Sequence, residues 1–336
     1  MRIKNAFTRK SSMRSSKVHS EELKNTLGLA IQIGKLASDQ SVLKFFELID
    51  FDVIRDIRDL TEMVNSHGFL KDKISETDFL IANAELENHH VNGVELIPYG
   101  SEFYPLSLAF TPNPPSILYI KGDKSILKEL PGVAIVGSRD TSPAGEEITR
   151  RITNQIVSAG YIVVSGLAIG TDANAHKATL QAKGKTIAVL AHGLEEAKPK
   201  QNSRLAQEIL DKGGAWISEY PMGRPAQKQS FVQRNRIQVG LSAGSILIEA
   251  ALNSGTITQA EFANKAKRPV FAVVPHLPNN PLNLNCEGTV DLVKSNMARA
   301  LKTKRDYDDV IMIINESREY LLELKWPGKQ STLDLI

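Results

Sequence analysis

Short apolar runs alternate with longer helical patterns over the central part of the chain. The runs lack strict apolar–polar alternation, and each is followed by small or polar residues, which is typical of strands buried on both faces. The expected strands are 133–136, 162–165, 186–190, 215–218, 245–249 and 270–274. The expected helices between them are 144–158, 173–182, 203–212, 233–241 and 258–267. This rhythm predicts an α/β fold of the extended Rossmann type, in which helices cover both faces of a doubly wound, mostly parallel sheet.

Helical patterns without strands occupy the preceding part of the chain. Ser20 can cap a helix in which Leu23, Leu27 and Ile31 recur at helical spacing, and three more helical patterns follow. We therefore expect a small helical module. The expected segments are an arm at 1–19, this module at 20–92, the α/β domain at 93–300 and a short extension at 301–336, with an edge strand expected at 310–314.

The formal net charge is only +3, but the charge is unevenly distributed. Basic residues and serines fill the start of the chain, and no acidic residue precedes Glu21. The basic residues are Arg2, Lys4, Arg9, Lys10, Arg14 and Lys17. We interpret 1–19 as a disordered, solvated arm. Two alternatives stay open, namely an arm that adds phosphate contacts to a nucleic-acid site and an organelle transit peptide.

Simple counts exclude several classes of protein. The single cysteine, Cys286, rules out an internal disulfide bond, and no Cys/His cluster has the spacing of a zinc site. No apolar run reaches the length of a membrane span, and no secretory signal is found near the start. We therefore expect a cytoplasmic protein with no membrane association, no metal and no cofactor.

Two loops at strand ends carry the residues of an anion site. Gly137, Ser138 and Arg139 follow the first predicted strand. The glycine allows close backbone approach, and the arginine can donate paired hydrogen bonds to a phosphate. Ser165 and Gly166 begin a similar loop after the second strand. Because the carboxyl ends of parallel strands lie at one edge of a sheet, we expect the two loops side by side, near helix N-terminal amides.

The glycines match neither of the common nucleotide-binding motifs. Gly166 and Gly170 lack the G-x-G-x-x-G spacing of a dinucleotide site. Gly184-Lys185-Thr186 resembles the end of a P-loop, but Thr179 stands where the first glycine is needed and the strand follows the motif. The loops therefore favour a phosphate chain over a dinucleotide.

A basic segment with one aromatic residue lies at 228–236. It contains Lys228, Phe231, Arg234 and Arg236. The two arginines are two positions apart on a predicted helix and point to different sides, so one is expected to contact phosphate and the other to pair internally. Phe231 is interpreted either as a stacking surface for a base or as a core side chain.

Three further polar residues are candidates for a pocket. Asp172 and His176 are four positions apart at the start of a predicted helix, where they could orient each other or contact a ligand. A helix-capping role for Asp172 is the alternative. His192 follows a strand and is expected at the rim. Glu219 and Glu249 also follow strands, but no nucleophile accompanies them, so we expect no catalytic step.

Taken in order, these motifs closely resemble the DNA-processing protein A (DprA/Smf) family over about residues 95–280. The motifs are Gly137-Ser138-Arg139, Ser165-Gly166-Leu167-Ala168-x-Gly170-x-Asp172-x-x-x-His176, Ser218-Glu219-Tyr220-Pro221, Phe231-x-x-Arg234-Asn235-Arg236-Ile237 and Glu249-Ala250-Ala251-x-x-Ser254-Gly255-Thr256. The chain departs from the family at Thr171 and at Ala191-His192-Gly193. About 36 residues follow Ala300, which is short for the winged-helix domain that many members carry.

The resemblance implies a homodimeric, non-enzymatic protein that binds single-stranded DNA without strong sequence preference. It further implies protection of single strands in natural transformation and recombination, and loading of a RecA-type recombinase. The implied DNA and phosphate contacts are Gly137, Ser138, Arg139, Ser165, Gly166, Lys228, Ser230, Phe231, Arg234 and Arg236. The expected pocket residues are Asp172, His176, His192, Asn235, Ser254, Gly255 and Thr256.

Two other kinds of function stay open at this point. One is a sensor of a nucleotide derivative, or a phosphoribohydrolase of a related Rossmann-like fold. Ser254-Gly255-Thr256 resembles the glycine-threonine-glutamate loop of those hydrolases, although a likeness of fold is a weak basis for function. The other is a structural or partner-binding role, for instance in a defence system.

Overall fold

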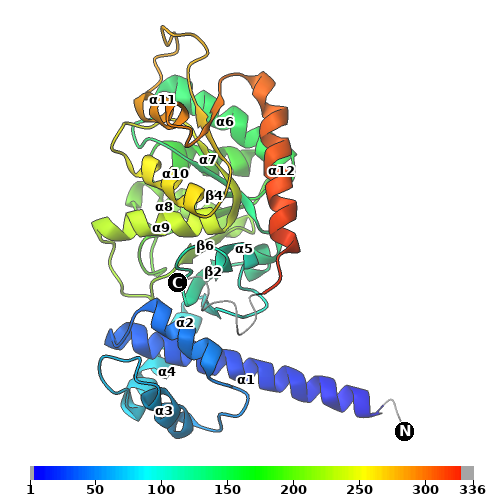
Figure 1. Ribbon diagram of the computed structural model, residues 1–336, viewed down its shortest axis with the longest axis vertical. Helices are drawn as coiled ribbons and strands as arrows, with labels where there is room; N and C mark the ends of the chain where they lie inside the picture. The colour runs from blue at the N-terminus through cyan, green and yellow to red at the C-terminus, as the bar shows by residue number, and fades with distance from the viewer. Residues whose placement is uncertain (1–3, 327–336) are drawn as a thin grey trace. The chain divides into compact units, whose positions relative to one another are not determined.

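The structure, a computed structural model, describes residues 4–326 and comprises two compact units (Figure 1). The smaller unit contains residues 4–104 and 115–119, and the larger unit contains residues 105–114 and 120–326. These units differ from the segments expected from the sequence, because residues 93–104 belong with the helices. In the smaller unit, the side-chain amide of Asn25 donates to the backbone oxygen of Leu96 at 3.1 Å, which ties the first strand to the first helix.

The described part of the smaller unit consists of four helices, one complete strand and the first three residues of β2 (Ile117–Gly122). The helices and the complete strand are α1 (Lys4–Gly34), α2 (Asp39–Leu48), α3 (Ile57–Ser66), α4 (Glu76–Val91) and β1 (Val94–Pro98). Side-chain caps define the helix starts, since Ser38, Asp56 and Ser75 each accept from an amide in the first turn. Fully buried side chains such as Leu27 and Phe45 form the core. The expected helical module is therefore present.

Helix α1 begins well before the expected cap. We expected 1–19 to be a disordered arm and Ser20 to start the helix, but residues 4–19 are helical and Ser20 lies inside α1. The segment 4–19 contains neither proline nor glycine, so nothing in it interrupts a helix that continues back from the packed part of α1. Residues 1–3 lie outside the described part of the chain.

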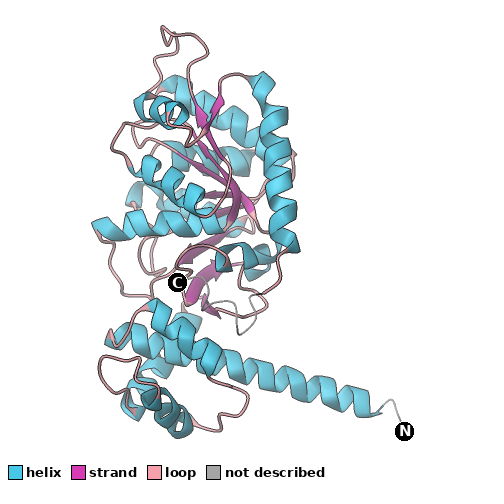
Figure 2. Ribbon diagram, in the orientation of Figure 1, coloured by secondary structure: helices cyan, strands magenta, loops and turns pink. Residues whose placement is uncertain are grey.

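The larger unit is a parallel sheet with helices on both faces (Figure 2). Its strands are β3 (Gly132–Val136), β4 (Val163–Ser165), β5 (Thr186–Val189), β6 (Ala215–Ser218), β7 (Ser242–Leu247), β8 (Val270–Val273) and β9 (Arg299–Leu301), and β2 (Ile117–Gly122) leads into the unit. The strand order is β6-β5-β4-β3-β7-β8-β9, and each neighbouring pair is parallel. The expected doubly wound fold is confirmed.

The helices of this unit follow the strands, as the sequence predicts. They are α5 (Leu106–Ala109), α6 (Pro143–Ser158), α7 (Thr171–Gln181), α8 (Ser203–Asp211), α9 (Lys228–Gly240), α10 (Gly255–Lys265), α11 (Glu287–Lys294) and α12 (Tyr307–Glu323). Short 3-10 turns cover Lys124–Glu129, Lys200–Asn202 and Lys304–Asp306.

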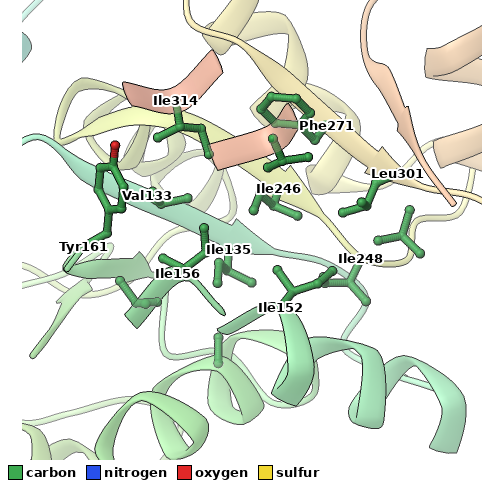
Figure 3. Close-up of a cluster of buried hydrophobic side chains, with 14 of the residues drawn as sticks. Val133, Ile135, Ile152, Ile156, Tyr161, Ile246, Ile248, Phe271, Leu301 and Ile314 are labelled. Carbon is green, nitrogen blue, oxygen red and sulfur yellow. The ribbon is translucent and has the colours of Figure 1, made fainter. Parts of the chain in front are cut away.

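Alternate side chains of the strands form two hydrophobic layers. Ile135 of β3 and Ile246 of β7 pack with Ile156 of α6 and Ile314 of α12 on one face (Figure 3). The next residues along the two strands, including Leu247, pack with α9, α10 and α11 on the other face. This division explains why the strands read as continuous apolar runs.

The C-terminal part of the fold differs from the sequence expectation. The expected edge strand at 310–314 is part of α12, in which Val310 and Ile314 are buried one turn apart. A run of five apolar residues fits either a strand or the buried side of a helix, and periodicity alone does not separate them. The edge strand is instead β9, whose three residues include the exposed Arg299 and give no apolar signal.

Candidate functional site

The loop after β3 lies where the strand order reverses. The chain passes from β3 through β4, β5 and β6 on one side and then returns to β7 on the other side. The amide of Ile248 donates to the oxygen of Val136 at 3.0 Å, so the carboxyl ends of β3 and β7 stay together. Ligands of open parallel sheets bind at such a switch point, in the crevice beyond the strand ends.

Gly137 is required by the packing behind this loop. A β-carbon at this position would lie 2.6 Å from Oγ1 of Thr171, the first residue of α7. The amide of Thr171 also donates to the oxygen of Ser138 at 3.1 Å, and the Ser138 hydroxyl bonds to the backbone of Asp140. The loop is therefore held against α7, and Arg139 extends from it as an exposed side chain.

A cavity of about 340 Å³ opens at the switch point. Its walls come from the loops after β3 and β7, from the start of α7, and from α9 and α10. The lining residues are Val136, Gly137, Ser138, Arg139, Ala168, Asp172, Phe231, Val232, Arg234, Asn235, Gln238, Ala251, Ser254, Gly255, Thr256 and Gln259. Most of the residues singled out from the sequence are among them.

The N-terminus of α10 opens into this cavity. Ser254 is its N-cap residue but makes no capping hydrogen bond, and Oγ of Ser254 has no hydrogen-bond partner among residues 4–326. A β-carbon on Gly255 would meet no atom within 4 Å, so the space beside the helix end is open. First-turn amides have no partner within a helix and carry partial positive charge. This end of α10 can therefore donate to an anion.

Arg234 forms the inner wall of the cavity. It is only 6% exposed, and its Nε has no hydrogen-bond partner in the described part of the chain. A β-carbon on Gly166 would lie 1.3 Å from Nη1 of Arg234, so the guanidinium occupies the space that the glycine leaves. Burial lowers the pKa of the guanidinium, and the charge of Asp172 opposes that shift.

Asp172 holds the loop after β4. Its Oδ2 accepts from the amides of Gly166 at 3.1 Å and Ala168 at 3.3 Å. Burial raises the pKa of the Asp172 carboxyl, and the charge of Arg234 is the main opposing influence. The helix-capping alternative is wrong in its detail, because Gly170 is the N-cap residue of α7 and Asp172 binds the preceding loop instead.

Three amide side chains join α9 to α10 beneath the cavity. The amide oxygen of Gln238 faces Nη1 of Arg234 at 2.7 Å, and its nitrogen donates to Gln259 at 3.2 Å and Asn235 at 3.1 Å. Asn235 in turn donates to the oxygen of Gly255 at 3.1 Å. Gln238 and Gln259 were not among the residues identified from the sequence. The one sequence feature that could have identified them is their spacing, since Gln238 follows Arg234 and Gln259 follows Thr256 by about one helical turn.

The mouth of the cavity carries a cation–aromatic pair. Cζ of Arg139 lies 5.7 Å from the ring centroid of Phe231, which is 36% exposed. The core alternative for Phe231 therefore does not hold. Lys228 is exposed at the first position of α9, on the approach to the same mouth.

Several predicted site residues lie outside the cavity wall. They are Ser165, Gly166, Lys228, Ser230, Arg236, His176 and His192. The hydroxyl of buried Ser165 donates to the oxygen of Ile135 at 2.6 Å, and Ser230 is buried beside Tyr220. Gly166 stands directly behind Arg234. Ser165 and Gly166 therefore shape the site from behind rather than line it.

Arg236 is paired in the interior. Its Nη2 lies 2.5 Å from Oε2 of Glu219, and its Nη1 lies 3.1 Å from Oε1. The side chains are 10% and 6% exposed. Arg236 is therefore the arginine of the segment that pairs internally, as expected for one of the two. Because a buried carboxylate engages its guanidinium, the assignment of Arg236 to the DNA contacts is corrected.

Both histidines are buried and hydrogen-bonded within the protein. Nδ1 of His176 lies 2.7 Å from Oγ1 of Thr186, and burial lowers the pKa of His176 to about 3. His192 bonds to the oxygen of Gly193, and burial lowers its pKa as well. Both side chains are buried, and neither is among the residues that line the cavity.

The chemistry of the site is that of anion binding. Arg139, Arg234 and the α10 N-terminus bring positive charge to one cavity, and Asp172, which also lines it, accepts from backbone amides. Within residues 4–326, no group of three or more His, Cys, Asp or Glu side chains is arranged to hold a metal ion. None of the described helices combines the length and hydropathy needed to cross a bilayer.

Fold and site together define a Rossmann-like protein with an anion cavity at the switch point of its sheet. The family described as DNA recombination-mediator protein A matches residues 95–312. The chain belongs to this family, as the DprA/Smf resemblance predicted. It is 41% identical over 210 residues to Protein Smf of Escherichia coli (strain K12), which covers 62% of this chain and 54% of Smf. The chain thus spans about half the length of that relative.

Two solved structures support the same assignment. DNA processing protein A from Streptococcus pneumoniae is 26% identical with a TM-score of 0.63, and covers 93% of this chain and 98% of its own. The protein from Helicobacter pylori is 27% identical with a TM-score of 0.58, and covers 67% of this chain and 97% of its own. The predicted fold class is confirmed by these neighbours.

Proposed function

We propose that this protein binds single-stranded DNA through its phosphate groups, as a DprA-like DNA-processing protein. The observation that carries the proposal is the nature of the free groups in the cavity. Two buried side-chain atoms of the cavity residues have no hydrogen-bond partner among residues 4–326, namely Nε of Arg234 and Oγ of Ser254; both can donate, and the α10 amides beside them are donors too. A phosphate supplies the matching acceptor oxygens.

The mouth of the cavity supports a single strand as the ligand. Arg139 and Lys228 offer charge to the backbone, and the exposed ring of Phe231 offers a surface on which any base can stack. The amides that could read base edges, led by Gln238, are bonded to protein groups instead. The H. pylori relative is described as having a unique single-stranded DNA binding mode. We therefore propose binding without sequence preference.

Family membership supports the wider role. We propose that the protein protects single strands in recombination and natural transformation and helps to load a RecA-type recombinase onto them. We further propose that it acts in the cytoplasm as a homodimer and without a catalytic step. The description of the family as a recombination mediator supports the role in recombination. The anion-binding groups of the cavity support a role in binding rather than in catalysis.

Fluorescence anisotropy with a labelled oligonucleotide tests the binding proposal. Arg139→Ala and Lys228→Ala should each weaken binding to oligonucleotides of any sequence. Each should also make the dependence of log K on log salt shallower by about 0.7 for every phosphate that the side chain neutralises. Lys212→Ala is the matched control, because Lys212 is exposed at the C-terminal end of α8, at the opposite edge of the sheet.

Single- and double-stranded oligonucleotides and mononucleotides should be titrated in parallel. We expect the single strand to bind best. Unchanged affinity and unchanged salt slope in both Arg139→Ala and Lys228→Ala would contradict the proposal. Tight binding of a mononucleotide with release of its base would favour the phosphoribohydrolase alternative.

A further inference from the structure

Some hydrogen-bond donors of the cavity lie deep inside it, where a DNA strand that only passes across the mouth would not reach them. Arg139 stands at the mouth, but Arg234 is only 6% exposed at the inner wall, and Ser254 is the N-cap residue of α10 beside it, without a capping hydrogen bond. The cavity of about 340 Å³ has room for roughly ten water molecules, so a phosphate group fills only part of it. A ligand that bonds to Arg234 must therefore enter the cavity, with its phosphate foremost.

We propose that the cavity binds a phosphate monoester, the terminal phosphate of a DNA strand, in preference to the phosphodiesters inside the strand. This inference rests on the proposed function and specifies which part of the strand the site takes. An internal phosphodiester has chain on both sides, and both arms would have to leave through the same mouth. A strand end has one arm, so its phosphate can reach Arg234 while the remaining strand leaves past Phe231.

The charge of the site also fits a monoester. A phosphodiester carries one negative charge, whereas a terminal phosphate carries about −1.5 to −2 at pH 7 and has three strong acceptor oxygens. Arg139 and Arg234 each carry one positive charge, and the N-terminus of α10 adds roughly half a charge. Together they supply a positive potential that matches a terminal phosphate. Asp172 also lines the cavity, but its Oδ2 is bound by the amides of Gly166 and Ala168.

The amide side chains of the inner wall are engaged by other protein groups. Gln238 bonds to Arg234, Gln259 and Asn235, and Asn235 bonds to the oxygen of Gly255. The free donors near them, Nε of Arg234 and Oγ of Ser254, suit phosphate oxygens. The inner part of the cavity is therefore a phosphate site, and it should accept a phosphorylated strand end whatever base that end carries.

A terminal phosphate has two sources, a strand end and a free nucleoside monophosphate, and the test separates them. The probes are one single-stranded sequence with a 5′-phosphate, with a 3′-phosphate and with hydroxyl ends, a circular single strand, and dTMP as competitor. An oligonucleotide two residues longer, with hydroxyl ends, controls for added charge. We expect at least one phosphorylated end to bind about tenfold tighter than the hydroxyl forms, since one added charge-assisted hydrogen bond is worth that much.

Variants connect the preference to the inner wall. In Ser254→Ala, the ratio of affinities for phosphorylated and hydroxyl ends should fall toward one. Ser158→Ala should keep the ratio, because Ser158 is an exposed residue at the far end of α6. Ser254 makes no capping hydrogen bond, so its replacement should leave the fold intact. A change in the ratio of affinities can then be attributed to the lost hydroxyl.

The outcomes separate this inference from the function on which it rests. Equal affinity for phosphorylated, hydroxyl-ended and circular strands would overturn the inference and leave single-strand binding in place. Failure of every strand to bind would overturn the proposed function itself. Displacement of the phosphorylated strand by dTMP at comparable concentration would assign the site to free monophosphates, and would also overturn the strand-end proposal.

Discussion

The guanidinium of Arg139 lies over the ring of Phe231, with Cζ 5.7 Å from the ring centroid. The two residues come from the loop after β3 and from the first turn of α9, which are about ninety positions apart in the chain. Their contact joins two walls of the cavity at its mouth. It also presents a charge for phosphate and an aromatic face for a base at one point.

A double-mutant cycle on this pair measures both roles. Phe231→Ala should weaken single-strand binding by about 1–3 kcal/mol, the value of one stacked base. Arg139→Ala should weaken binding and lower the salt slope. The two effects should not add, with a coupling of about 0.5–1 kcal/mol, because each residue orients the other. Anisotropy titrations of the four proteins give these values.

An abasic oligonucleotide provides the control for stacking. If Phe231 stacks on a base, Phe231→Ala should lose less affinity for an abasic strand than for the normal strand, and the smaller loss should match the coupling to Arg139. An equal loss of affinity on the normal and abasic strands would show that Phe231 acts only by holding Arg139.

Gly166 makes room for Arg234, and an added methyl group should remove that room. In Gly166→Ala the new β-carbon would lie 1.3 Å from Nη1 of Arg234, so the guanidinium must leave the inner wall. Overpacking of this kind typically costs about 1–3 kcal/mol of unfolding free energy, and DNA binding should fall with it. Urea denaturation measures the change in stability, and anisotropy measures the change in binding.

Two further variants control this prediction. Gly255→Ala should cost no stability, because nothing lies within 4 Å of its added β-carbon and alanine favours a helix. The double change Gly166→Ala with Arg234→Ala should be less destabilised than the sum of the two single changes. Strict additivity would show that the glycine and the arginine do not share the space.

The features that could be predicted from the sequence are those that a local pattern of residues determines. Buried parallel strands are continuous apolar runs, and small residues such as Gly137 follow them because the chain must turn closely there. Fold class, strand positions and the loop after β3 followed from these signals, whereas Asn235, Ser254, Gly255 and Thr256 of the cavity wall followed from the family resemblance. The prediction of a strand at 310–314 is wrong, because five apolar residues also fit one side of a helix, as Val310 and Ile314 do in α12.

The assignment of individual polar side chains could not be predicted in the same way. The spacing of Arg234 and Arg236 showed that they face different sides of α9, but not which one is paired. That choice depends on Glu219 at the end of β6, which only the tertiary fold brings to α9. The same applies to His176, which was predicted to be a pocket residue. Its hydrogen bond to Thr186 of β5 depends on how α7 packs against the sheet, and the sequence of the helix does not reveal it.

The pairing of Arg236 with Glu219 predicts a structural role for this arginine. Arg236→Met removes the guanidinium that neutralises the buried carboxylate of Glu219 and should lower the unfolding free energy by about 3–5 kcal/mol. Replacing both residues, Arg236→Met with Glu219→Leu, should recover much of that stability. Chemical denaturation of Arg236→Met, of the double variant and of the unchanged protein tests this.

The salt dependence of DNA binding distinguishes the structural role from a DNA contact. The double variant should keep the salt slope of the unchanged protein, because Arg236 neutralises no phosphate. A slope that becomes shallower, as expected for Arg139→Ala, would return Arg236 to the DNA-binding residues.

His176 is held in one protonation state by its neighbours. The hydroxyl of Thr186 donates to the oxygen of Val163 at 2.8 Å, so it accepts from Nδ1–H of His176 at 2.7 Å. Nε2 is buried, without a hydrogen-bond partner in residues 4–326. Burial and the charge of Arg234 lower the pKa of His176 to about 3 from 6.5, so the ring is neutral in the folded protein near neutral pH.

This pKa shift makes folding stability depend on pH. Between pH 6.5 and pH 3 the unfolded chain binds a proton at His176 and the folded chain does not. The contribution is therefore fully present above pH 6.5 and is lost as the pH falls, by at most about 1.4 kcal/mol per unit. His176→Asn keeps a donor for Thr186 and removes the titration. Urea denaturation at pH 7.5 and pH 5 should show a smaller loss of stability in the variant, by on the order of 1–2 kcal/mol. The raised pKa of Asp172 acts in the opposite direction but is common to both proteins, so equal losses would contradict the assignment.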